Sequence, residues 1–234
     1  MFKPKLSKTM QAELRDTLER GGCPLCRLAA RAEESFLNSL TYERILDFGT
    51  REELKHSRGM CLRHARAWRE VHGCALGVAI VYENVIKDLL GDTELEFESS
   101  LKFWETRATP TQLAEELAPS ATCPACQVGA DAAARFANVL LQDIHQEHIR
   151  TALEQAGGLC LPHLRLTLAL RGSTESKRLL LEVERQAWTA LRAELQEFIR
   201  KNDYRFRDEP KGSERDSWLR AMDALVGLNL DRVA

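Results

Sequence analysis

The chain has 234 residues, and 44% of them are apolar, so it is long enough to fold as one large or two small domains around a proper core. Its charged fraction of 29% is typical of a folded globular protein rather than a disordered one. The formal net charge of -2 excludes a strong overall attraction to nucleic acid or to an anionic membrane.

The N-terminal residues are basic and are followed by polar sequence, so we expect no secretory signal. The longest apolar stretch, residues 74–82, is far shorter than the roughly 20 residues that cross a bilayer. We therefore predict a cytoplasmic protein without a membrane partner. In a reducing compartment, seven cysteines favour metal binding or redox chemistry over structural disulfides.

Helical periodicity describes the first half of the chain. Met10, Leu14 and Leu18 recur every four residues and predict an amphipathic helix over residues 7–20. A matching apolar stripe at every fourth residue predicts a helix over residues 28–40. Thr50 and Glu53 fit a capping box, which predicts that a short helix begins there. Apolar spacing after residue 78 predicts another helix, ended by Gly91.

The second half repeats this pattern and then adds two helices. We expect a short helix between the prolines at 110 and 119, and a helix with an apolar stripe over residues 128–140. A long helix follows over residues 175–200, then a polar loop over 201–213 and a last helix over 214–226. Strand-like alternation is not convincing anywhere, so the predicted fold class is all-α.

An internal duplication organises the chain. Cys23-Pro-Leu-Cys26 returns as Cys123-Pro-Ala-Cys126 at an offset of 100, and Gly59-Met-Cys61-Leu-Arg-His64 returns as Gly158-Leu-Cys160-Leu-Pro-His163 at an offset of 99. The apolar stripe between the motifs matches as well. We therefore predict two helical modules, residues 1–108 and 109–203, followed by a C-terminal loop and helix, residues 204–234, packed on the modules.

The repeated motifs have the composition of zinc sites. Zinc prefers tetrahedral sulfur and nitrogen ligands, and structural sites are closed by four protein groups. A proline after the first cysteine suits the first turn of a helix, where free N–H groups and the helix dipole stabilise thiolates. We expect two Zn²⁺ per chain, each pinning one helical hairpin of one module. The first site would use Cys23, Cys26, Cys61 and His64, and the second would use Cys123, Cys126, Cys160 and His163.

Two other chemistries fit parts of the pattern. A CPxC motif at a helix start is also the arrangement of a dithiol redox site, but that interpretation leaves the paired Cys-x-x-His motifs unexplained. Three cysteines and a histidine could also hold an iron–sulfur cluster, although such clusters usually prefer four cysteines.

Arginines gather in two places and have two interpretations each. The group around the first Cys-x-x-His motif either forms a solvated face or binds an acidic partner; it comprises Arg58, Arg63, Arg66 and Arg69. Near the C-terminus, Arg205, Arg207 and Arg220 either pair with nearby carboxylates or build an anion-binding pocket.

The paired CPxC and GxCLxH motifs, with a closing DYRFRDEP…SWLRA segment, resemble those of an uncharacterised family of bacterial proteins of about this length. The resemblance spans nearly the whole chain. It implies a bacterial, cytosolic protein and assigns the eight cysteines and histidines named above to the family's motif positions. It implies no activity.

Three functions remain open at this point. The first is a non-enzymatic binding, adaptor or regulatory protein for a protein or nucleic-acid partner, with an exposed apolar or basic patch. The second is a redox-responsive zinc–thiolate protein. The third is an enzyme that uses the C-terminal arginines, although no catalytic constellation is recognised in the sequence.

Overall fold

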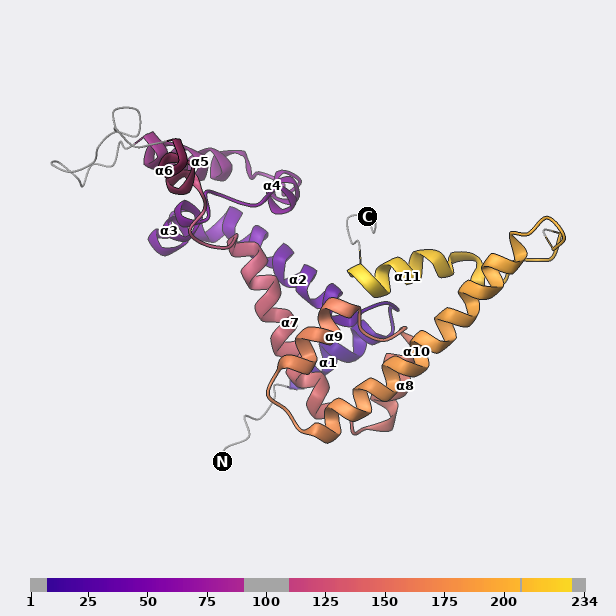
Figure 1. The fold of residues 1–234 in the computed structure, drawn as a ribbon. Helices are drawn as coiled ribbons and strands as arrows, with labels where there is room; N and C mark the ends of the chain where they lie inside the picture. The colour runs from indigo at the N-terminus through magenta and orange to yellow at the C-terminus, as the bar shows by residue number, and fades with distance from the viewer. Residues whose placement is uncertain (1–7, 91–109, 207, 229–234) are drawn as a thin grey trace. The chain divides into compact units, whose positions relative to one another are not determined.

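The computed structural model describes residues 8–90, 110–206 and 208–228. Across these ranges the chain forms helices and no strand, which confirms the all-α prediction (Figure 1). The α-helices are α1 (Lys8–Leu18), α2 (Pro24–Ser39), α3 (Phe48–His56), α4 (Leu62–Arg69), α5 (Ala75–Leu90), α6 (Pro110–Leu117), α7 (Pro124–Asp143), α8 (Glu147–Gln155), α9 (Leu161–Ala169), α10 (Thr174–Lys201) and α11 (Ser217–Val226). A π-helical turn, Leu40–Arg44, follows α2, and a 3-10 turn, Ser213–Asp216, precedes α11.

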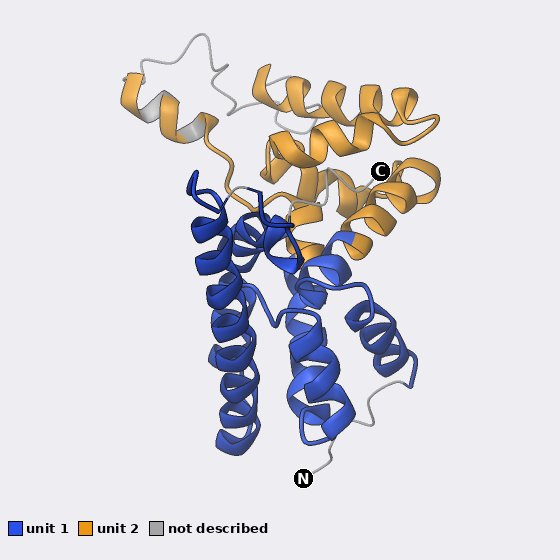
Figure 2. Cartoon of the chain, turned by 90° about the vertical axis from the view of Figure 1, so that its right-hand side faces the viewer, with its two compact units in different colours: residues 1–30, 130–234 blue, residues 31–129 orange. Residues whose placement is uncertain are grey.

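The helices belong to two compact units (Figure 2). Unit 1 comprises residues 1–30 and 130–234, and unit 2 comprises residues 31–129. These units are not the consecutive segments expected from the repeat. The difference arises because α2 and α7 each contribute to both units, so that each unit combines parts of both repeats.

Unit 1 is built around the long helix α10, which packs along α8 and α11. Helix α11 also contacts α9, and α1 contacts α8. The predicted stripe of α1 is confirmed, because Leu14 and Leu18 are buried in the core of this unit. They lie with buried residues of the second repeat, among them Leu140, Ile144, Leu153 and Leu180.

Unit 2 has its own core, in which α3 packs against α5. Trp68 of α4 is almost fully buried, and its indole Nε1 donates a hydrogen bond to Thr41 Oγ1 at 2.9 Å. The core also takes Leu40, Leu54 and Val81. Each unit therefore buries a separate apolar cluster.

Two predicted helix starts are corrected. Helix α3 begins at Phe48, not at Thr50, because the Asp47 carboxylate caps it by accepting hydrogen bonds from both Thr50 N (2.8 Å) and Thr50 Oγ1 (2.7 Å). The last helix begins at Ser217 rather than Glu214, after the 3-10 turn. The predicted helix end at Gly91 lies outside the described residues.

Candidate metal centres

Each of the four cysteine motifs stands at the start of a helix, as predicted. Pro24 and Pro124 are the first residues of α2 and α7, directly after Cys23 and Cys123. Cys61 and Cys160 are the N-cap residues of α4 and α9. The sulfurs therefore lie where unpaired backbone N–H groups and the helix dipole favour negative charge.

One cluster of metal-ligating side chains lies in unit 1 and consists of Cys23, Cys26, Cys160 and His163. The histidine Nδ1 lies 3.4 Å from Cys23 Sγ, 3.3 Å from Cys26 Sγ and 3.2 Å from Cys160 Sγ. The sulfurs of Cys26 and Cys160 are 3.6 Å apart. All four donor atoms lie within 4.8 Å of one another.

The other cluster lies in unit 2 and consists of Cys61, His64, Cys123 and Cys126. Its histidine Nδ1 lies 3.4, 3.5 and 3.3 Å from the sulfurs of Cys61, Cys123 and Cys126, respectively. Cys61 Sγ and Cys126 Sγ are 3.6 Å apart. The two clusters thus have nearly the same dimensions.

These distances are those of a tetrahedral site. Metal–sulfur and metal–nitrogen bonds of about 2.3 and 2.0 Å place neighbouring tetrahedral ligands roughly 3.5 to 3.8 Å apart. Within each cluster, the donor atoms lie within 4.8 Å of one another, so the residues present fit one four-coordinate ion. Both clusters could hold a metal ion.

The expected pairing of the motifs is wrong. We expected Cys23 and Cys26 to meet Cys61 and His64 of their own repeat, but they meet Cys160 and His163 of the other repeat. The reason is that α2 begins in unit 1, where its CPxC motif lies, and ends in unit 2. Sixteen helical residues cover about 24 Å, so the next motif along the chain joins a different cluster.

The Gly-x-Cys segments are held in the same way in both units. Gly59 and Gly158 have φ values of +86° and +81°, a conformation that glycine adopts without steric cost. The backbone N–H of the next residue is bound by a side chain from another helix. Tyr82 Oη accepts from Met60 N at 3.3 Å, and Glu184 Oε1 accepts from Leu159 N at 2.6 Å.

A carboxylate lies beside the second ring nitrogen of His64. Glu33 Oε2 lies 3.3 Å from His64 Nε2, and Arg63 donates to Glu33 Oε1 at 2.7 Å. Burial acts to raise the pKa of Glu33, but the hydrogen bonds with His64 and Arg63 outweigh it and lower that pKa. A carboxylate in this position fixes the orientation of a metal-binding imidazole. The sequence analysis did not single out Glu33. The available signal was a difference between the repeats, because the position that matches Glu33 holds the uncharged Ala133.

Glu184 gives the protein a pH-dependent stability. Only 2% of its surface is exposed, and burial raises its pKa from 4.5 to about 7, despite the hydrogen bond from Leu159. An acidic group whose pKa is higher in the folded chain than in the unfolded chain stabilises the fold while it is protonated. For Glu184 this contribution is complete below the unfolded-chain pKa of 4.5, and it is lost as the pH rises through about 7. Glu184→Gln keeps an acceptor for Leu159 N but cannot ionise. Between pH 5 and pH 8, we expect the unfolding free energy of the variant to fall by about 2 to 3 kcal/mol less than that of the parent.

Urea denaturation at intervals across this pH range measures the difference. Glu182→Gln is the control, because Glu182 lies exposed on the same helix. Parallel pH profiles for the parent and the Glu184→Gln variant would contradict the assigned ionisation.

Four arginines of the two groups pair with carboxylates. Arg63 binds Glu33 as described, and Arg58 binds Asp88 at 2.8 Å. Arg205 pairs with Asp203 at 2.7 Å, while Arg220 pairs with Glu194 and Asp216 at 2.5 and 2.9 Å. Arg207 lies outside the described residues.

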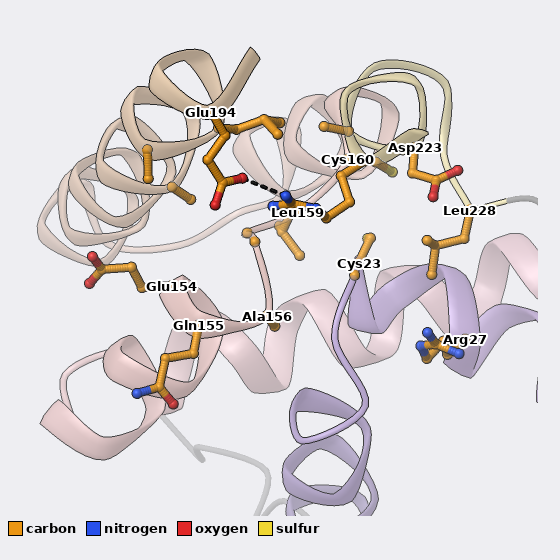
Figure 3. A pocket seen from close by; sticks show the side chains of 18 of the residues that line it. Cys23, Arg27, Glu154, Gln155, Ala156, Leu159, Cys160, Glu194, Asp223 and Leu228 are labelled. Atoms are coloured by element: carbon orange, nitrogen blue, oxygen red, sulfur yellow. Dashed lines mark ion pairs between the residues drawn. The ribbon is translucent and has the colours of Figure 1, made fainter. Parts of the chain in front are cut away.

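A groove of about 650 Å³ adjoins the cluster of unit 1 (Figure 3). Cys23, Cys160 and Leu228 lie around it, and Arg220, Glu194 and Asp223 supply polar groups. Arg205 is not among its lining residues. The groove therefore borders two of the candidate ligands.

Comparison with known proteins places the chain in a family. Residues 8–231 match DUF6062, a family of unknown function, and the chain belongs to that family. It is also similar to an uncharacterized 23.9 kDa protein of Caldicellulosiruptor sp. (strain Rt8B.4), with 25% identity over 183 residues, which covers 78% of this chain and 83% of that protein. No solved structure matches the chain. Among the helices that the structure describes, none combines the length and apolar character of a membrane span.

Proposed function

We propose that the protein binds two zinc ions through closed Cys₃His centres that are structural rather than catalytic. The observation that carries this proposal is the convergence of three sulfurs and one imidazole nitrogen in each unit, within 4.8 Å of one another. Sulfur and nitrogen donors in a tetrahedral set suit zinc, and four protein ligands leave no open position for a substrate.

The same spacing favours a single ion over an iron–sulfur cluster. A cluster binds its protein ligands through different irons and needs room for several metal and sulfide atoms between them. Sulfur–sulfur distances of 3.6 Å suit ligands of one ion. The iron–sulfur alternative is therefore the weaker one.

For its role in the cell, we propose a cytoplasmic, non-enzymatic binding, adaptor or regulatory protein with a protein or nucleic-acid partner. Helix α11 exposes Trp218, Met222 and Leu225 at helical spacing, which supports contact with another macromolecule. An enzyme that uses the C-terminal arginines has less support, because Arg205 and Arg220 are already paired with carboxylates.

Elemental analysis with an absorption spectrum tests the metal. We expect two zinc ions per chain and a colourless solution when the protein is purified without added metal and without air. Iron with sulfide and a brown solution would contradict the proposal and favour electron transfer or cluster sensing. Zinc that leaves after stoichiometric peroxide, with reversible thiol oxidation, would instead favour the redox-responsive alternative.

A further inference from the structure

We propose that the two metal centres are unequal: the centre in unit 1 exchanges its ion with competing metal ligands, whereas the centre in unit 2 retains its ion. This inequality presupposes the zinc sites proposed above. The competing ligand would be a small molecule or peptide with a thiolate or imidazole donor.

In unit 2 a carboxylate lies beside the second ring nitrogen of the histidine. In unit 1 no such carboxylate is found among the described residues. His64 is 2% exposed, and Glu33 lies against its Nε2. Arg63 holds Glu33 and also interacts with the sulfur of Cys126. His163 is only partly buried, and its side-chain hydrogen bonds within the described residues, to Cys23, Cys26 and Cys160, all use Nδ1. Loss of such a support typically lowers metal affinity about 10- to 100-fold.

The repeat shows that this support exists in one copy only. Ala133 occupies the position that matches Glu33, and Pro162 the position that matches Arg63. Neither residue can hold an imidazole. Gly129 also makes room for Glu33, because a Cβ at position 129 would lie 2.2 Å from Glu33 Oε1. The residue that matches Gly129 in the other repeat is Ala29, which carries a Cβ.

The two centres differ in which of their ligands are partly exposed. Each cluster contains two buried and two partly exposed ligands. In unit 1 one of the exposed ligands is His163, and in unit 2 both are cysteines. The imidazole is the uncharged member of each ligand set, so it has the weakest Coulomb attraction to the ion and is the easiest ligand to displace.

The groove of unit 1 reaches two sulfur ligands of the centre, Cys23 and Cys160, whereas His163 is not among its lining residues. Its volume of about 650 Å³ is enough for a small chelating molecule (Figure 3). Its edge is formed in part by the segment that follows α11, where Leu228 N donates to Cys26 Sγ at 3.4 Å. An incoming thiolate would bind the ion as His163 Nδ1 leaves as a neutral imidazole, with no change of oxidation state.

Zinc release to a chromogenic chelator tests the inequality. The two-zinc protein is mixed with excess 4-(2-pyridylazo)resorcinol, and the zinc complex is followed by absorbance. We expect two phases of one zinc each, with rates that differ about 10- to 100-fold. Cys160→Ser is expected to abolish the fast phase, and Cys61→Ser the slow phase. Circular dichroism checks that the other unit of each variant is folded.

Glu33→Gln tests the cause. We expect this substitution to accelerate the slow phase about tenfold or more and to leave the fast phase unchanged. Glu34→Gln, at the neighbouring exposed position, is the matched control and is expected to change neither phase. Release of both ions in one phase, or a fast phase that survives in Cys160→Ser, would overturn the inequality while leaving the zinc sites intact. A purified protein without zinc would overturn the proposed function itself.

Discussion

A protein in which Cys23 and Cys160 are both replaced by serine is expected to keep one of its two metal ions. Both side chains belong to the cluster of unit 1, so the second substitution removes a ligand from a centre that the first has already disabled. Cys23→Ser combined with Cys61→Ser should lose both ions, because it damages one centre in each unit. Pairing of motifs within each repeat would give the opposite result for the two double variants.

Cobalt substitution measures this outcome. Co²⁺ absorption reports how many tetrahedral thiolate sites a chain holds, and elemental analysis gives the total metal. Cys74→Ser is the control, since Cys74 belongs to neither cluster, and it should keep both ions. If the Cys23 and Cys160 double variant lost both ions while the Cys23 and Cys61 double variant kept one, the ligand sets described here would be incorrect.

Removal of the metal is expected to unfold much of the protein. In each centre the ion would join the N-termini of two helices, α2 with α9 and α4 with α7. Structural zinc contributes about 10–16 kcal/mol of apparent binding free energy in small zinc domains, which is comparable to the whole stability of an ordinary domain. Even a net loss of about 5 kcal/mol per unit would lower the melting temperature by roughly 10 to 40 °C.

Thermal melting followed by circular dichroism, with and without a high-affinity zinc chelator, measures this loss. Added zinc should restore the helical signal after the chelator is removed. A chain that is metal-free by elemental analysis, yet melts at the same temperature with the same helical content, would show that the ions are not structural.

The sequence determined the helices because their signals are local. The stripe of Leu14 and Leu18 predicted α1, and the prolines after Cys23 and Cys123 marked the first turns of α2 and α7. The eight candidate ligands were likewise readable from the repeat. One local signal misled: Thr50 resembled a cap, but Asp47 three residues earlier binds its N–H and its hydroxyl.

Only the tertiary structure decided which ligands meet and what supports them. Residues 23 and 160 are far apart in sequence, and either pairing of the four motifs satisfies the same spacing rules; the course of α2 and α7 through both units selects one of them. Glu33 carries no motif and acquires its place beside His64 only when α2 and α4 pack in unit 2. Periodicity and capping depend on neighbours a few residues away, whereas a metal centre depends on where distant helix ends arrive in space.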